Sequence, residues 1–184
     1  LKSWQINCCI LVFFFLFVMF MFRNEINSMF VSFGQLTSNI EDVYLLKYDY
    51  VWQHIPFHKE FFRLLDDGKL FSWSWNLFLG TSFYASKAYY LVGDIFTYIT
   101  YGLDKFINFT EISMFMVLLL KIIVAGFGFT LLLRKVKVKI WIAILFGCIY
   151  SFSGWQTIFL EQPVFTSFYA ILPFLFVGAE YILQ

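Results

Sequence analysis

The sequence predicts an all-α integral membrane protein with about four transmembrane helices and one long loop after the first of them. Hydrophobic residues make up 61% of the 184 positions and charged residues only 14%, against roughly 45–50% and 25% in soluble domains. The mean hydropathy is +0.76, so a water-soluble fold would have to expose a large apolar surface. Several apolar runs are long enough to cross a bilayer, which takes about 20 residues.

Four apolar runs meet that length, and each predicts a transmembrane helix. The first carries no charge from Ser3 to Phe22, and no small-residue cleavage site follows it, so we expect a retained anchor and not a removed signal peptide. The other three runs are Ile112–Leu133, Ile140–Leu160 and Pro163–Ile182. The sequence lacks an initiator Met and ends beside a hydrophobic run, so we expect it to be the N-terminal part of a larger membrane protein.

The loop between the second and third spans decides the predicted orientation. Arg134, Lys135, Lys137 and Lys139 place four cations within residues 134–139, and short cationic loops mark the cytoplasmic side. The loop after the first span, residues 23–111, is therefore expected outside. It also carries seven Lys and Arg residues, but loops beyond about 60 residues cross the membrane largely regardless of charge.

The charge balance and the cysteines argue against two classes of site. The net charge is +1 with a pI of about 7.8, so there is no basic footprint for nucleic acid, and we expect no nucleic-acid partner. Cys8 and Cys9 lie in the first apolar run and Cys148 in the third, with no Cys-x-x-Cys pair. We therefore expect no disulfide framework, and cysteines that act as small buried apolar side chains.

The outer loop is rich in aromatic residues for a connecting segment. Its 89 residues hold 22 of the chain's 44 aromatic residues. Aromatic residues gather at membrane interfaces, because an apolar body with a polar tip suits that depth. We therefore expect the loop to lie along the outer membrane surface as interfacial helices.

One helix of this loop can be placed from its sequence. Pro56 suits the first turn of a helix and Gly68 suits its end. Between them the apolar residues follow the spacing of one helical face: Phe57, Phe61, Leu64 and Leu65. The pattern predicts an amphipathic helix, which either lies in the plane of the interface or packs against other protein.

Two features of the sequence are candidates for charge or metal chemistry. Lys121 stands nine residues into the second apolar run, about 14 Å along a helix, so we expect it near the middle of the bilayer. A cation there should face a partner such as Glu161, or the phosphate of an anionic lipid. His54 and His58 have the i, i+4 spacing of a helical metal site, although Pro56 between them breaks the regular geometry.

The outer loop contains an ordered series of residues: an Asp, then Gln-x-x-Pro, an amphipathic stretch that ends in Gly, a Trp-Asn pair, Gly, and a Tyr-rich segment. These are Asp49, Gln53, Pro56, Gly68, Trp75, Asn76, Gly80 and Tyr89-Tyr90. The series resembles the pattern of the YfhO family of bacterial multi-spanning membrane proteins. The resemblance covers about residues 5–184, the front of a longer family member.

The resemblance implies a function. YfhO proteins are similar to the GT-C glycosyltransferases, which have many spans, an acidic residue in the first outer loop and polyprenyl-phosphate sugars as donors. YfhO relatives are associated with glycosylating lipoteichoic acid in Gram-positive bacteria. The expected partners are therefore membrane lipid, a polyprenyl-phosphate-linked sugar and a cell-envelope polymer as acceptor, in the bacterial cell membrane.

The same resemblance suggests which residues carry the chemistry. Glycosyl transfer needs a base for the acceptor hydroxyl and a group that stabilises the leaving phosphate. Asp49 is the candidate catalytic base, with Glu41 and Asp42 as weaker candidates. The candidate substrate-binding residues are Gln53, Trp75, Asn76, Asp94 and Lys121. The cofactor is unknown, and a divalent cation is left open.

Two other functions compete with the glycosyltransferase. A transporter or lipid-flipping component would use Lys121 and a fourth span broken at Pro173. A non-catalytic membrane subunit would use its outer loop to dock a partner. An acidic outer loop of this length favours the enzyme, because transporters usually place their polar sites at the membrane midplane.

Overall fold

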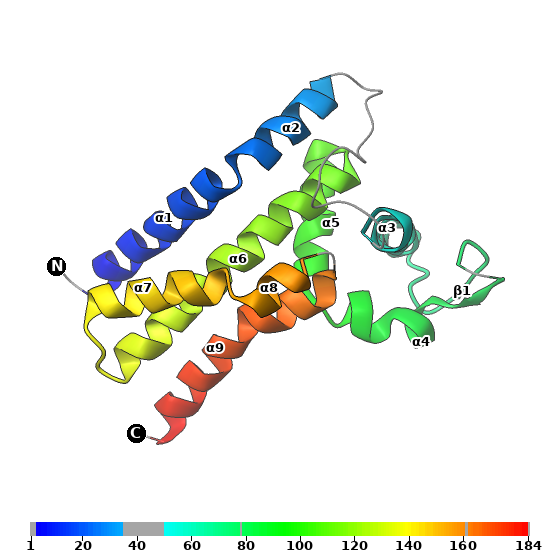
Figure 1. Cartoon of the computed structure of the whole chain (residues 1–184). Helices are drawn as coiled ribbons and strands as arrows, with labels where there is room; N and C mark the ends of the chain where they lie inside the picture. The colour runs from blue at the N-terminus through cyan, green and yellow to red at the C-terminus, as the bar shows by residue number, and fades with distance from the viewer. Residues whose placement is uncertain (1–2, 35–49, 78, 161, 184) are drawn as a thin grey trace.

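The computed structural model describes residues 3–34, 50–77, 79–160 and 162–183. Four helical segments in these ranges are long and apolar enough to cross a membrane. They are α1 (Ser3–Met21), α6 (Thr110–Lys135), α7 (Ile140–Ser151) continued by α8 (Gly154–Ile158), and α9 (Pro163–Leu183). The predicted all-α membrane fold is thus confirmed (Figure 1).

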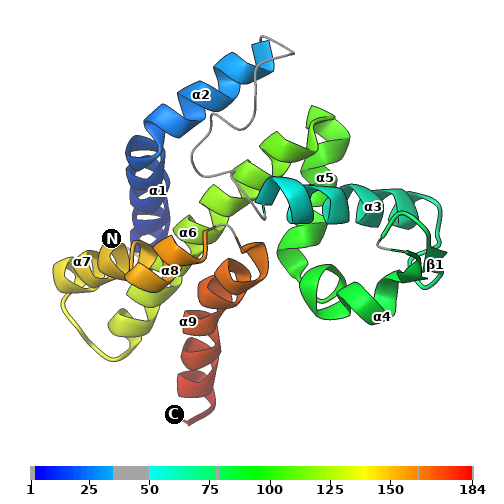
Figure 2. The same cartoon turned by 45° about the vertical axis from the view of Figure 1, so that its right-hand side comes forward.

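The segment between the first two spans folds into further short elements. Helix α2 (Arg23–Gly34) continues from α1 after a bend at Phe22, and Figure 2 shows the change of direction. A π-helical turn η3 (Tyr50–His54) leads into α3 (Ile55–Asp66). The rest consists of β1 (Trp73–Ser74), β2 (Thr81–Ser82), α4 (Phe83–Lys87), π-helical η4 (Ala88–Val92) and α5 (Ile95–Ile107). We call residues 50–77 and 79–107 the outer lobe, after the side of the membrane on which the sequence predicts it.

Helix α6 is the centre of the structure. It packs against α1, α5, α7 and α9, and it also contacts α3 (Figures 1 and 2). Its N-terminal half is covered on almost every side, with Ile112, Phe115, Leu118 and Ile122 all buried. The helix therefore belongs to both the spanning bundle and the outer lobe.

Small residues allow the spanning helices to approach closely. A Cβ atom added at Gly147 of α7 would lie 2.8 Å from the carbonyl oxygen of Gly126 on α6 and would also collide with the side chain of Thr130. A Cβ atom at Gly128 would collide with the ring of Phe174 on α9. Close helix contact through small residues is a common way to pack helices in a membrane, where burial from water supplies no driving force.

The amphipathic helix expected between Pro56 and Gly68 is present as α3. Of its predicted apolar face, Phe57, Phe61 and Leu64 are buried, and Leu65 packs beside them. They lie against buried residues of the hairpin, α4 and η4: Leu77, Phe83 and Leu91. The sequence left open whether this face lies in the membrane interface or packs against protein. The structure shows that it packs against other elements of the same chain.

The cysteines depart from the expectation. Cys8 and Cys9 are exposed on α1 and Cys148 is half-buried on α7. The prediction that they are buried was wrong for the first two, because α1 contacts the other spans along one stripe only, at Ile10, Phe14 and Val18. The outward face of a spanning helix meets lipid, so apolar side chains there need no protein cover.

Candidate functional site

The N-terminus of α5 places one carboxylate at the junction between the outer lobe and the spanning bundle. Asp94 caps this helix, because its Oδ1 accepts a hydrogen bond of 3.0 Å from the backbone N–H of Phe96. Its Oδ2 accepts a bond of 2.5 Å from the hydroxyl of Ser167 on α9. Asp94 is buried, at 7% exposure. One side chain therefore connects α5 with α9.

Lys121 of α6 reaches the same carboxylate. Its Nζ lies 3.7 Å from Asp94 Oδ2 and donates a 3.0 Å hydrogen bond to the carbonyl oxygen of Pro163. The side chain is 4% exposed, and it also lies over the ring of Phe96. Glu161, which we expected as its partner, lies outside the described residues. The carboxylate that the structure places beside Lys121 is Asp94.

His58 of α3 borders this ion pair. Its Nδ1–H donates a 2.8 Å bond to the carbonyl oxygen of His54, which leaves Nε2 as an acceptor. Burial lowers the pKa of His58 to about 3, and the nearby charge of Lys121 acts in the same direction, so the ring is neutral. A cavity of about 10 Å³ lies among His58, Thr100, Lys121 and Pro163, which is room for about one water molecule.

The second histidine has a different environment. His54 Nε2 lies 3.1 Å from Gln162 Oε1, so the turn η3 is tied to the start of α9. Within the described parts of the chain, no group of three His, Cys, Asp or Glu side chains could hold a metal ion. His54 joins η3 to the chain just before α9, and His58 bonds to His54 within the lobe, beside the ion pair.

A second polar cluster lies at the base of the β1–β2 hairpin. Glu60 of α3 is 6% exposed and accepts four hydrogen bonds. Two come from the Arg63 guanidinium at 2.9 and 2.7 Å, one from Ser74 at 2.5 Å and one from the Asn76 amide at 2.8 Å. These donors, with Arg63 first, lower the pKa of Glu60 to about 2. A charged Glu60 therefore fastens the hairpin to α3.

The hairpin presents aromatic rings to its surroundings. Trp75 is 76% exposed and Trp73 is 55% exposed, with ring centroids 5.7 Å apart in an edge-to-face arrangement. Gly80 has a φ of 97°, and a Cβ atom there would lie 2.6 Å from the Trp75 ring and 2.7 Å from Trp73 Nε1. Only glycine fits this backbone conformation and this contact, so Gly80 fixes the Trp pair.

The structure separates the predicted site residues into two groups. Asp94 and Lys121 meet at the junction, and Trp75 and Asn76 meet at the hairpin. Helix α3 joins the two groups, with His58 at the first and Glu60 at the second. Gln53 lies half-buried on η3. The candidate base Asp49, with Glu41 and Asp42, lies outside the described residues.

Sequence reasoning missed Glu60 and the structural role of His58. Glu60 looked like one of several charges on the polar face of an amphipathic helix. The available signal was the i, i+3 pair with Arg63, since such a pair places a cation beside the carboxylate. Its contact with Asn76, sixteen residues away, depends on how the chain turns at the hairpin.

Comparison with known proteins identifies the family. A profile described as bacterial membrane protein YfhO matches residues 28–184, which includes the outer lobe and the last three spans. The chain belongs to the YfhO family. No curated protein and no solved structure matches the chain. This YfhO protein is therefore a multi-pass protein of the bacterial cell membrane, in agreement with the resemblance seen in the loop motifs.

Proposed function

We propose that this YfhO protein is part of a polytopic glycosyltransferase that transfers a sugar from a polyprenyl-phosphate donor to a cell-envelope polymer such as lipoteichoic acid. The observation that carries the proposal is the family match over residues 28–184. This region contains the ordered motif residues of the outer loop that resemble those of the family. Membrane-bound donor and acceptor both suit an enzyme whose acidic loop lies beside the bilayer.

In the proposed reaction Asp49 is the general base. It takes the proton of an acceptor hydroxyl while that oxygen attacks the anomeric carbon of the donor sugar. The bond from this carbon to the lipid phosphate breaks, and its electron pair leaves with the phosphate. The leaving phosphate needs a cation or hydrogen-bond donors, and a divalent cation is the candidate for that role.

The hairpin is the proposed sugar-binding surface. Exposed aromatic rings such as Trp75 offer an apolar face with specific geometry, and the amides of Asn76 and Gln53 offer both donors and acceptors. The bond from Asn76 to Glu60 orients its amide. We assign Lys121 and Asp94 a positioning role, because both are buried and bonded to each other or to the protein. Phosphate binding by Lys121 would require this pair to open.

The test compares variants of the complete protein in a strain that lacks the chromosomal copy. Asp49→Asn keeps the shape of the side chain but removes its basicity, so glycosylation of the envelope polymer should fall by roughly 10²-fold or more. Asp67→Asn, at another carboxylate of the outer lobe, is the matched control and should leave glycosylation unchanged. Equal protein levels in the membrane must accompany both results. Normal glycosylation in Asp49→Asn would remove this residue from the active site.

The transport alternative loses one of its two supporting features. Helix α9 is continuous from Pro163 to Leu183 with Pro173 inside it, so the fourth span is not broken at Pro173 as expected. Transporter sites are typically formed by unwound segments whose backbone groups face the substrate. The other feature, Lys121, is bonded to Pro163 and lies beside Asp94.

A further inference from the structure

Several contacts between helices lie at the same position along the length of the bundle as Lys121, and we call this position the level of Lys121. Lys121 bonds to the first residue of α9, Pro163, and its neighbour Ile122 accepts a 3.2 Å bond from Ser151 at the end of α7. The next residue of that helix end, Phe152, stacks on Phe22 with ring centroids 6.0 Å apart. Arg23 follows directly and begins the polar helix α2. The bend after α1, the C-terminal end of α7 and the first residue of α9 therefore lie at the level of Lys121.

A second level lies at the other end of the bundle. Arg134 of α6 bonds to Asn7 of α1, and Lys135 lies 3.6 Å from the ring centroid of Tyr181 on α9. From Lys121 to Lys135 the helix rises about 21 Å, and from Pro163 to Tyr181 about 27 Å. These lengths approach the hydrocarbon thickness of about 30 Å once cationic side chains extend toward water.

The part of α6 beyond the first level is covered by protein over most of its surface, although Met116 is 45% exposed. Met114, Phe115, Leu118 and Leu119 are all buried, and this half of α6 packs on α5 and α3. By contrast α7 exposes Trp141, Leu145, Ile149 and other large apolar side chains. An apolar helix that stands in water needs a protein cover, whereas one in lipid does not.

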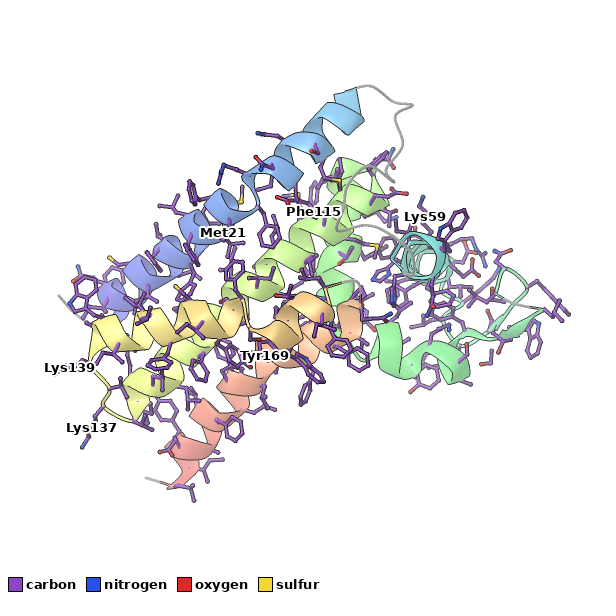
Figure 3. All side chains as sticks on the ribbon, viewed as in Figure 1. Met21, Lys59, Phe115, Lys137, Lys139 and Tyr169 are labelled. Atoms are coloured by element: carbon purple, nitrogen blue, oxygen red, sulfur yellow. The ribbon has the colours of Figure 1, made fainter. Side chains whose placement is uncertain are left out.

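An apolar groove runs along this covered half. It has a volume of about 340 Å³ and lies between α6, the α1–α2 bend and α5, and every described residue that lines it is hydrophobic. Phe115 lies in the space between α6 and the junction of α1 with α2 (Figure 3). One end of the groove is at Phe15 and Ile123, inside the span, and the other is at Met29 and Ile112.

The two ends of the groove lie at different depths. Ile112 is nine residues before Lys121 and Met29 is seven residues after Phe22, which correspond to about 14 Å and 10 Å along their helices. Apolar cavities of about 150 Å³ stay dry and take up hydrocarbon ligands. A larger groove without a polar lining, continuous with the lipid at one end, therefore fits a hydrocarbon chain.

We propose that the outer boundary of the bilayer lies at the level of Lys121, and that this groove binds the hydrocarbon chain of one outer-leaflet lipid whose headgroup stands above that boundary. Lys121 then lies near the membrane surface and not in its middle. The proposal that the groove binds a hydrocarbon chain rests only on the geometry of α1, α2, α5 and α6. That the lipid is the polyprenyl-phosphate donor rests on the proposed function.

Photolabelling of the complete protein in vesicles of phosphatidylglycerol and phosphatidylethanolamine tests the groove. The vesicles carry a trace of polyprenyl phosphate with a diazirine on its chain, and adducts are mapped by mass spectrometry. We expect adducts at Met29 and Met116, which line the groove beyond the boundary. Adducts confined to residues of the spans, such as Leu145, would overturn the proposal, as would protection of Met29 and Met116 by another segment of the protein.

Two matched variants sharpen the result. Met116→Trp fills the groove and should lower the yield of Met29 adducts by roughly tenfold, the equivalent of roughly 1.4 kcal/mol of lost binding. Leu145→Trp places the same ring on the lipid-facing side of α7 and should change nothing. Equal adduct yields in the two variants would contradict a groove site.

Competition identifies the lipid. Excess unlabelled polyprenyl phosphate should remove the Met29 and Met116 adducts, whereas excess phosphatidylglycerol should not. The reverse result would overturn the assignment to the donor. Groove adducts in a protein that shows no glycosyltransferase activity would overturn the proposed function and leave the groove in place. Glycosyltransferase activity without groove adducts would overturn the groove proposal and leave the proposed function in place.

Discussion

Lys121 Nζ lies 3.7 Å from Asp94 Oδ2, and both side chains are almost completely buried. The pair joins the central helix α6 to the first turn of α5, while Ser167 ties the same carboxylate to α9. An isolated charge buried in this way would cost several kcal/mol. The packing of the outer lobe on the bundle therefore requires this ion pair.

Removal of one partner should therefore destabilise the protein. Lys121→Met leaves the Asp94 carboxylate buried without its cation, and unfolding free energy should fall by about 3–5 kcal/mol. Thermal unfolding of the protein in lipid nanodiscs measures the change. The double variant Lys121→Met with Asp94→Asn removes both charges and should recover a large part of the loss. Wild-type stability in the single variant would show that the Asp94 carboxylate is not left unpaired.

The hairpin should respond to acid through Glu60. Because folding lowers the pKa of Glu60 from 4.5 to about 2, its stabilising effect is fully present above pH 4.5 and is lost as the pH falls toward 2. Fluorescence of Trp73 and Trp75 should change across this window as the base of the hairpin loosens. Subtraction of the spectrum of a Trp73→Phe, Trp75→Phe variant isolates their signal.

Glu60→Gln provides the control for this titration. Its neutral amide cannot hold the Arg63 guanidinium as a carboxylate does, so the hairpin signal should already be altered at neutral pH and should not titrate between 4.5 and 2. An unchanged acid transition in Glu60→Gln would assign it to another group.

The orientation can be tested by cysteine labelling. Figure 3 shows Lys137 and Lys139 at the opposite end of the molecule from Lys59 of the outer lobe. In a background without Cys8, Cys9 and Cys148, we expect an impermeant maleimide to label Lys69→Cys in intact cells. Lys137→Cys should react only after the membrane is permeabilised. The reverse pattern would invert the topology.

The close contact between α6 and α7 predicts a difference between two glycines. A methyl group at Gly147 would collide with Gly126 and Thr130, whereas Gly178 of α9 has nothing within 4 Å of the same position. Gly147→Ala should therefore lower stability by about 1–3 kcal/mol. Gly178→Ala should be neutral, or more stable by up to about 1 kcal/mol through helix propensity. Equal thermal stabilities would show that α6 and α7 can separate without cost.

The number of spans and the position of α3 were predictable because they depend on local properties. An apolar run of about 20 residues is long enough to cross a bilayer wherever it occurs, and the repeat of Phe57, Phe61 and Leu64 makes one apolar face. The same reasoning could not say what this face touches. Its packing on Leu77 and Phe83 depends on the turn at the hairpin, which no local pattern determines.

The sequence by itself thus determined the membrane class, the four apolar segments that could cross the bilayer and the order of motifs that marks the YfhO family. Only the tertiary structure decided that Lys121 meets Asp94, that Glu60 holds Asn76, and how far α6 extends beyond the ends of its neighbours. The length of an apolar run shows that a helix can cross a bilayer. The position of the bilayer boundary along such a helix depends on which other helices cover it.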